Sequence, residues 1–295
     1  MAMTTRQRWT VSQDGASLAY WEQGSGPAVV LTNGFANSTL YWGPVRDRLA
    51  AKYRVITWDL RGHGRSGPVR DRATMTVVGC ADDLRRVMDA AGLNEAVLAG
   101  FSFGSQIVLE AYRQIPERVR GIAPVLGPFG RPFDTLLHPQ IGPRVFELFR
   151  CIPAGLWGIG LKVGAMTPLL RPVHRMAQSL ELICSNVSFE EMKPFYLHLA
   201  RVDVSSWYAM GLAAQEHCAQ DLLAEINVPA LVVAGGRDRF SPGYLGREMA
   251  RKIPDARLVW LEEATHTGLF GARQEIGDAM EEFLEEICQS VDWRS

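Results

Sequence analysis

Short, nearly unbroken apolar runs alternate with amphipathic helical patterns through the first part of the chain. A strand that is buried on both faces of a sheet is apolar along its whole length. Between two of the runs, residues 81–91 carry apolar side chains on one helical stripe, and Gly92 follows as a stop signal. Strands separated by helices join through right-handed crossovers, so the pattern predicts an α/β fold with a mostly parallel sheet flanked by helices. The runs occupy residues 28–32, 54–58, 96–99 and 121–126.

The same alternation returns near the end of the chain. Apolar runs at 229–236 and 257–261 predict two more strands, and the patterns at 242–252 and 272–289 predict two more helices. Both ends of the chain are therefore expected to contribute to one sheet.

The middle of the chain breaks this alternation. It opens with the turn-forming cluster at 127–132 and continues with helical patterns that are rich in Phe, Trp, Tyr and Leu, without a convincing strand. We expect residues 1–126 and 221–295 to form one α/β core, and residues 127–220 to form an all-helical cap over the carboxyl ends of its strands. The alternative is an independent helical domain.

The charge balance and the placement of apolar residues argue against a nucleic-acid partner, a membrane span and a signal peptide. Lys and Arg number 31 against 32 Asp and Glu, so the chain lacks the positive surplus that phosphate binding requires, and we expect no nucleic-acid partner. Pro153, Lys162 and Pro168 interrupt the most apolar long stretch, which argues against a membrane span. The N-terminus has no apolar segment of the signal-peptide kind.

Cysteine usage is typical of a cytoplasmic protein with reduced thiols. The cysteines are odd in number, scattered, and without the spacing of metal ligands or of a disulfide framework. They are Cys80, Cys151, Cys184, Cys218 and Cys288.

The sharpest chemical signal is the sequence Gly100-Phe101-Ser102-Phe103-Gly104. It follows the predicted strand at 96–99 and precedes a helical pattern at 106–113, which is the strand-turn-helix setting of a nucleophile elbow. Small residues are needed at both glycine positions, two residues before and after the serine, because the turn is tight. The helix N-terminus behind the serine stabilises developing negative charge. Ser102 is therefore the predicted nucleophile; its alternative role is to cap the following helix.

A serine nucleophile needs a general base, and histidine is the usual one. His266 follows the last predicted strand and can reach back over the sheet, which makes it the predicted base. Histidines in the predicted cap are expected to be surface or partly buried side chains without a catalytic role. The remaining histidines are His63, His138, His174, His198 and His217.

The predicted acid that orients the base is Asp238, at the end of the strand at 229–236. Its alternative role is to form the turn before the helix at 242–252, but Ser241 is expected to cap that helix, with Pro242 in its first turn. Asp134 is the reserve acid.

These motifs together resemble the α/β-hydrolase superfamily with a helical cap, over nearly the full length of the chain. The order Ser102, Asp238, His266 is the order of that family's triad. The resemblance implies that His63, within a D-x-R-G-x-G-x-S loop at 59–66, supports the loop. It also implies an oxyanion hole made by the backbone N–H groups of Phe35 and Phe103.

Two positions distinguish this chain from relatives. Many relatives have His-Gly where this chain has Asn33-Gly34. The backbone donor does not depend on that side chain, so the oxyanion hole is expected to survive without the usual support of the loop. Relatives that open epoxides or remove halides use an aspartate nucleophile, and Ser102 excludes that chemistry.

The sequence therefore predicts a serine hydrolase that cleaves carboxylic esters of small to medium apolar molecules and needs no cofactor or metal. Lactone opening, acyl transfer or C–C bond cleavage by the same triad are alternatives, as is a ligand-binding protein without turnover. A homodimer is left open. Cations of the predicted cap are expected to face solvent; one that faced inward would instead pair with a substrate carboxylate. These cations are Arg131, Arg144, Arg171 and Lys193.

Overall fold

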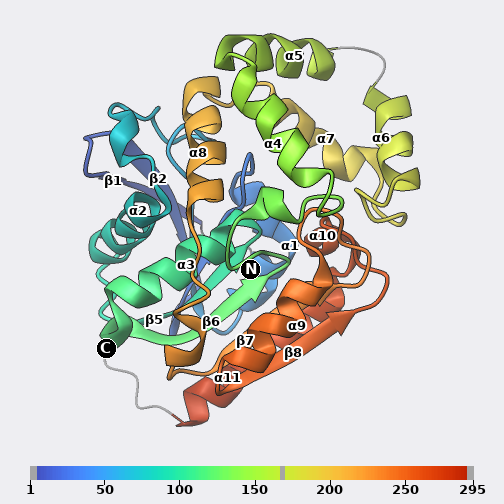
Figure 1. Ribbon diagram of the computed structural model, residues 1–295. Helices are drawn as coiled ribbons and strands as arrows, with labels where there is room; N and C mark the ends of the chain where they lie inside the picture. The colour runs from blue at the N-terminus through green and yellow to red at the C-terminus, as the bar shows by residue number, and fades with distance from the viewer. Residues whose placement is uncertain (1–4, 167–169, 291–295) are drawn as a thin grey trace.

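The computed structural model contains an eight-stranded sheet with the order β1-β2-β4-β3-β5-β6-β7-β8 (Figure 1). The structure describes residues 5–166 and 170–290. β2 pairs antiparallel with β1 and β4, whereas the later neighbours pair in parallel, so the predicted mostly parallel sheet is confirmed. The strands are β1 (Arg6–Val11), β2 (Ser17–Gln23), β3 (Ala28–Thr32), β4 (Arg54–Trp58), β5 (Ala96–Phe101), β6 (Val119–Val125), β7 (Ala230–Gly235) and β8 (Ala256–Leu261).

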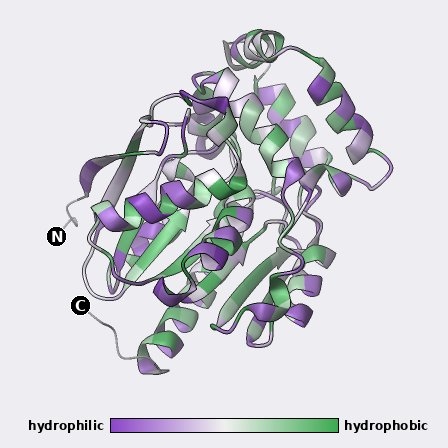
Figure 2. Ribbon diagram, turned by 60° about the vertical axis from the view of Figure 1, so that its left-hand side comes forward, coloured by the Kyte–Doolittle hydropathy of each residue, from purple (hydrophilic) through white to green (hydrophobic). Residues whose placement is uncertain are grey.

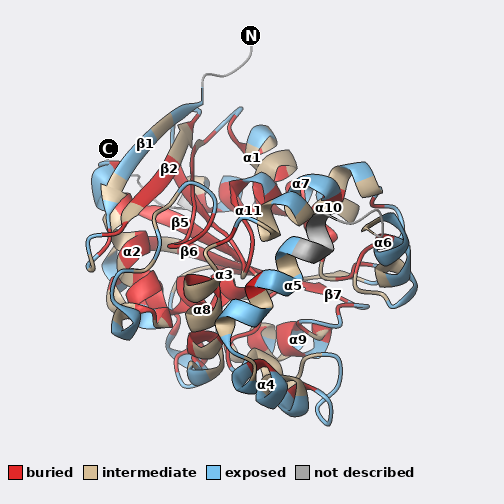
Figure 3. Cartoon of the chain, turned by 90° about the horizontal axis from the view of Figure 1, so that it is seen from above, coloured by how far each residue is buried: buried red, intermediate tan, exposed pale blue. Residues whose placement is uncertain are grey.

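Helices cover both faces of the sheet. One apolar cluster joins the sheet to α2 (Val77–Ala90), α3 (Phe103–Gln114) and α9 (Gly243–Lys252). A second cluster on the other face joins it to α1 (Gly43–Leu49) and α11 (Arg273–Ser290). Figure 2 shows the apolar strands between helices whose outer faces are hydrophilic, and Figure 3 shows the buried residues concentrated at the centre. The sheet is therefore a rigid base, with both faces sealed.

Several element boundaries differ from the expected ones for local reasons. α2 begins at Val77 rather than at 81, because Thr76 caps it: its side chain accepts a hydrogen bond from the Gly79 N–H at 2.9 Å. The prediction that Ser241 caps α9 is wrong. Pro242 occupies the cap position in an extended conformation, and the Ser241 N–H donates instead to Asp238.

The segment between β6 and β7 is helical, as predicted, and no strand occurs in its described residues 127–166 and 170–220. Its helices lie above the sheet in Figure 1, except for α8, which runs down beside α3. The division of the chain at 126/127 and 220/221 stays a prediction. The helices are α4 (Gly142–Cys151), α5 (Ala154–Met166), α6 (Leu170–Ser179), α7 (Phe189–Leu199) and α8 (Val204–Glu216).

The remaining helices are short. They are α10 (Gly268–Gly271) and the 3-10 helices Thr39–Trp42, Arg72–Thr74, Pro116–Arg118, Pro132–Asp134 and Leu223–Glu225. Within the described part of the chain, no helix combines the length and the hydropathy needed to cross a bilayer.

A buried ion-pair cluster holds the loop after β4. The Arg61 guanidinium lies 2.7 Å from Asp83 and 3.2 Å from Asp14, and it donates to the Thr74 hydroxyl at 2.6 Å. Both of its carboxylate partners are essentially inaccessible to solvent, with at most 1% of either side chain exposed. The loop is therefore attached to α2 and to the turn after β1 by charge-assisted hydrogen bonds.

Replacing Arg61 with Met should lower the free energy of unfolding by about 3–5 kcal/mol, because it leaves two buried carboxylates without their counter-charge. Urea denaturation followed by circular dichroism measures this loss. Arg65→Met is the matched control: Arg65 lies in the same loop, but its side chain is exposed and donates to Gln7. Equal losses in the two variants would contradict the assigned role of Arg61.

Candidate active site

Ser102 occupies a sharp turn between β5 and α3. Its backbone has φ 55° and ψ −120°, in a region that residues with a side chain rarely adopt. Neighbouring glycines permit the turn: a Cβ on Gly100 would lie 2.1 Å from the Gly104 oxygen, and one on Gly104 would lie 2.6 Å from the Thr32 oxygen. The strand, turn and helix therefore present Ser102 at the carboxyl edge of the sheet, as predicted from the sequence.

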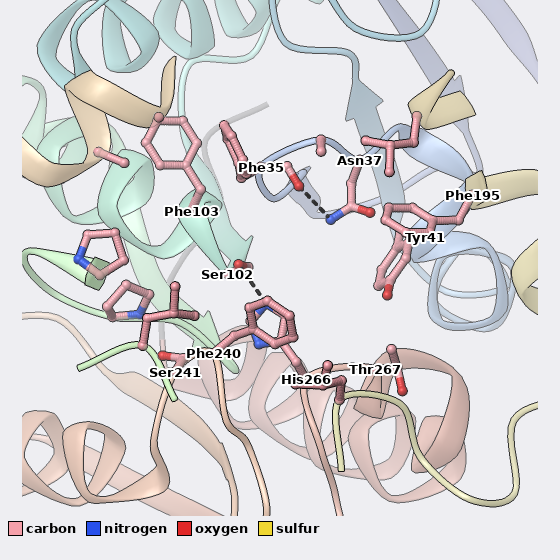
Figure 4. Close-up of a pocket in the computed structure, with 18 of the residues that line it drawn as sticks. Phe35, Asn37, Tyr41, Ser102, Phe103, Phe195, Phe240, Ser241, His266 and Thr267 are labelled. Carbon is pink, nitrogen blue, oxygen red and sulfur yellow. Dashed lines mark hydrogen bonds between the residues drawn. The ribbon is translucent and has the colours of Figure 1, made fainter. Parts of the chain in front are cut away.

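His266 and Asp238 form a continuous hydrogen-bonded chain with this serine. His266 Nε2 lies 2.8 Å from Ser102 Oγ, and His266 Nδ1 lies 2.8 Å from Asp238 Oδ2. The Asp238 side chain is fully buried, whereas that of His266 retains 15% exposure. Figure 4 shows Ser102 and His266 pointing toward each other at the floor of a cavity. The three residues predicted from separate parts of the sequence thus lie in one row.

Asp238 also performs the role that the sequence offered as its alternative. Its Oδ1 atom accepts hydrogen bonds from the Phe240 and Ser241 backbone N–H groups, both at 2.8 Å. One carboxylate oxygen therefore shapes the turn before α9 while the other faces His266. This arrangement fixes the direction in which the carboxylate points.

The loop after β3 lies beside Ser102 and carries Phe35. Neither the Phe35 nor the Phe103 backbone N–H donates to another described residue, so both donors are free for an acceptor near Ser102. A Cβ on Gly34 would lie 2.9 Å from the Ser102 Cβ, which shows how closely this loop approaches. Two free backbone N–H groups near a serine hydroxyl are the donors from which an oxyanion hole is built.

Asn33 supports the loop that carries Phe35. Its Nδ2 atom donates to the Trp58 carbonyl oxygen at 2.6 Å, in the interior of the protein. Beyond the loop, the Thr39 N–H donates to Asp59 Oδ1 at 3.0 Å. The loop is therefore attached to β4 and to the segment that follows it.

The other histidines do not approach Ser102. His63 is buried, its Nδ1 lies 2.9 Å from the Arg61 carbonyl oxygen, and burial lowers its pKa to about 4. This position within the loop agrees with the structural role expected for it. His174 contacts the Tyr196 hydroxyl at 2.8 Å, and His217 contacts Glu110 at 3.2 Å. Burial also lowers the pKa of His198, while His138 is exposed.

Asp134, the reserve acid, does not line the cavity that contains Ser102. Asp134 lies in an exposed 3-10 helix of the helical insertion, where its carboxylate accepts a hydrogen bond from Gln215 at 2.6 Å. The contact belongs to the packing of that helix against α8. Asp134 therefore has a structural partner of its own.

A cavity of about 430 Å³ opens in front of Ser102 and His266, between the sheet and the helical insertion. Its walls are largely aromatic and aliphatic, and no Asp, Glu, Lys or Arg is among the described residues that line it. The apolar wall comprises Phe35, Phe103, Phe133, Leu136, Leu161, Leu182, Ile183, Met192, Phe195, Leu199, Trp207 and Phe240.

A contact between the helical insertion and the histidine loop was not detectable in the sequence. The Cys184 N–H donates to Thr267 Oγ1 at 2.8 Å, and Cys184 Sγ accepts from the Thr265 N–H at 3.4 Å. These bonds hold the residues on both sides of His266. Because the partners are far apart in the chain and are common residue types, no local pattern marks them.

Comparisons with known proteins identify the family of this chain. The model of the "Alpha/beta hydrolase family" matches residues 29–280. RutD from Azorhizobium caulinodans, which is provisionally named a carbamate hydrolase, is 31% identical over 94% of this chain and 97% of its own length.

Solved structures show the same fold. The esterase RhEst1 from a Rhodococcus species superposes with a TM-score of 0.76, at 22% identity over 97% of this chain and all of its own. The enol-lactonase from Burkholderia xenovorans does so with a TM-score of 0.72, at 21% identity over 94% of this chain and all of its own. The family model and the similarity to RutD show that the chain is a member of the α/β-hydrolase family and a hydrolase.

Proposed function

We propose that this protein is a serine hydrolase that cleaves carboxylic esters with small to medium apolar acyl groups. The observation that carries the proposal is the hydrogen-bonded row of Ser102, His266 and Asp238 at the floor of a cavity whose described lining residues include no Asp, Glu, Lys or Arg. A base within 2.8 Å of a serine hydroxyl can accept its proton during attack.

In the first half of the reaction, Ser102 Oγ attacks the ester carbonyl carbon while His266 Nε2 takes the hydroxyl proton. Asp238 holds the imidazole in the correct orientation and stabilises its positive charge. The Phe35 and Phe103 N–H groups donate to the carbonyl oxygen as it becomes negative. When the tetrahedral intermediate collapses, the C–O bond to the alcohol breaks and His266 returns the proton to the leaving alkoxide.

In the second half, water replaces the alcohol. His266 removes a proton from the water molecule, whose oxygen attacks the acyl carbon bound to Ser102. The bond to Ser102 Oγ then breaks, and the proton held by His266 returns to that oxygen. The carboxylic acid leaves, and no cofactor or metal takes part in these steps.

The cavity walls favour neutral acyl groups. A carboxylate buried among apolar side chains without a cation is costly. The cap cations do not line the cavity: Arg131, Arg144, Arg171 and Lys193 are all exposed. Arg171 in particular is paired with Glu190.

Other reactions use the same atoms. A lactone is a cyclic ester, and the similarity to an enol-lactonase structure keeps lactone opening as a second candidate. The relative named as a carbamate hydrolase suggests a smaller substrate, but a free carbamate ion would find no cation in this cavity. A homodimer and a cytoplasmic location stay predictions, as do acyl transfer, C–C bond cleavage and binding without turnover.

Replacing Ser102 with Ala should lower kcat for p-nitrophenyl butanoate by about 10⁴-fold or more, because the attacking oxygen is lost. A fluorophosphonate probe should label the wild-type protein on the peptide that contains Ser102 and leave the variant unlabelled. Thermal unfolding of the variant checks that the fold is intact. Near-normal turnover by the variant, or labelling elsewhere in the chain, would refute the role of Ser102.

Replacing Asp238 with Asn should lower kcat by about 10⁴-fold. The amide oxygen stays on the Phe240 and Ser241 N–H groups, so the NH₂ group faces His266 Nδ1, holds the imidazole in the wrong tautomer and no longer stabilises its positive charge. Asp134→Asn is the matched control, since it alters an exposed carboxylate away from the cavity. Steady-state kinetics on p-nitrophenyl butanoate compares them. A larger loss in the Asp134 variant would move the acid to the earlier position.

Lengthening the acyl chain of neutral p-nitrophenyl esters should raise kcat/KM by up to about fourfold per methylene, since each buried CH₂ contributes about 0.8 kcal/mol. The gain should end, and the rate fall, once the cavity is full. The p-nitrophenyl monoester of succinic acid should react much more slowly than the pentanoate, which has an acyl chain of similar length but no charge. A preference for the succinate monoester would show that a cation enters the cavity.

A further inference from the structure

Tyr41 is a polar side chain set into the apolar wall near His266. It lies in the 3-10 helix Thr39–Trp42, directly after the oxyanion loop, and only 5% of it is exposed. Its ring stacks on Phe101 at a centroid distance of 4.9 Å and meets the edges of Phe195 and Phe270 at 5.7 and 4.8 Å. Three aromatic contacts therefore fix where the phenol hydroxyl can lie.

The Tyr41 hydroxyl has no hydrogen-bond partner within residues 5–166 and 170–290, although a buried phenol usually has one. By contrast, Tyr20 donates to the Ala90 carbonyl oxygen, and Tyr196 lies 2.8 Å from His174. Tyr41 lines the cavity, and its oxygen is not among the unpaired polar atoms that the protein seals from solvent. The free hydroxyl is therefore available to a molecule in the cavity.

Position and charge state define what this hydroxyl can bind. Figure 4 shows Tyr41, Phe195 and Thr267 on one side of Ser102, with Ser241 on the other. Burial raises the pKa of Tyr41 well above its usual range, and the nearby Cys184, Tyr196 and Asp238 act in the same direction. The phenol stays protonated and keeps a hydrogen to donate.

We propose that Tyr41 is a specificity-determining residue whose hydroxyl donates a hydrogen bond to an oxygen atom in the body of the substrate, separate from the ester group that reacts. This inference rests on the proposed ester hydrolysis. The preferred substrate is a neutral, largely apolar ester that carries one ether or keto oxygen along its acyl chain.

The physical reason is that either chain removes water from the Tyr41 hydroxyl, but only a chain with an oxygen gives the hydroxyl a new acceptor. A pure hydrocarbon chain that fills this side of the cavity displaces water from the Tyr41 hydroxyl and leaves it unpaired. A chain with an oxygen at the matching depth replaces the lost hydrogen bond. The hydroxyl thus discriminates between two chains of the same shape, which an apolar wall alone cannot do.

The test uses p-nitrophenyl heptanoate and four isosteres in which one ether oxygen replaces a chain methylene: the butoxyacetate, 3-propoxypropanoate, 4-ethoxybutanoate and 5-methoxypentanoate. For each protein, kcat/KM of every isostere is divided by that of the heptanoate. Because both values in a ratio come from the same protein, the fraction of folded enzyme cancels. Tyr41→Phe removes the hydroxyl and retains the stacked ring.

We expect one isostere for which the Tyr41→Phe substitution lowers this ratio by about 5- to 10-fold. Ser241→Ala is the matched control, because it removes a cavity-lining hydroxyl on the other side of Ser102 and should leave that ratio unchanged. If Tyr41→Phe slows all five esters by the same factor, the hydroxyl acts on the reacting carbonyl and the proposal is wrong. Unchanged ratios for every isostere would also overturn it.

The experiment separates this inference from the function on which it rests. Wild-type protein that hydrolyses none of the five esters would refute ester hydrolysis of such chains. Wild-type protein that hydrolyses the heptanoate, with ratios that do not respond to Tyr41→Phe, would refute only the role of Tyr41.

Discussion

The strained backbone at Ser102 is the constraint on which the rest of the site depends. A residue with a side chain holds φ 55° only where its surroundings leave no alternative. Here α3 packs so closely on β5 and β3 that a Cβ on Gly100 or Gly104 would overlap backbone atoms. The sheet beneath is sealed on both faces, and its rigidity holds the turn in place. The serine hydroxyl is thereby fixed where His266, from the loop after β8, lies 2.8 Å away.

Hydrogen bonds hold each further part of the site in place. Asn33 ties the oxyanion loop to Trp58, and Asp238 is oriented by the backbone of its own turn. Cys184, in the helical insertion, is hydrogen-bonded to Thr265 and Thr267, on either side of His266. The cap therefore does more than cover the cavity: its packing and the position of the histidine are coupled.

Much of the fold could be predicted from the sequence because most sheet strands are buried on both faces. β3 and β4 were predicted with their observed ends, since each is a closed apolar run between polar or turn residues. No such run predicts β1 or β2. β1 is a mostly exposed edge strand with polar side chains, and the polar residues Ser17, Glu22 and Gln23 leave β2 only a short apolar stretch. Helix starts were misplaced at α2 and α9, where the cap depends on which side chain or turn the backbone meets in space.

The sequence by itself was enough to predict Ser102, Asp238 and His266 as candidate site residues, because the turn glycines and the strand ends that carry them leave a local pattern. Only the tertiary structure decided that these side chains lie 2.8 Å apart. It also decided that no cation of the described cap residues lines the cavity, and that the Tyr41 hydroxyl at the cavity has no partner among the residues that the structure describes. Backbone geometry is encoded locally through glycines and apolar runs. The charge and hydrogen bonding of a cavity wall depend on which distant side chains meet, and no short stretch of sequence contains that information.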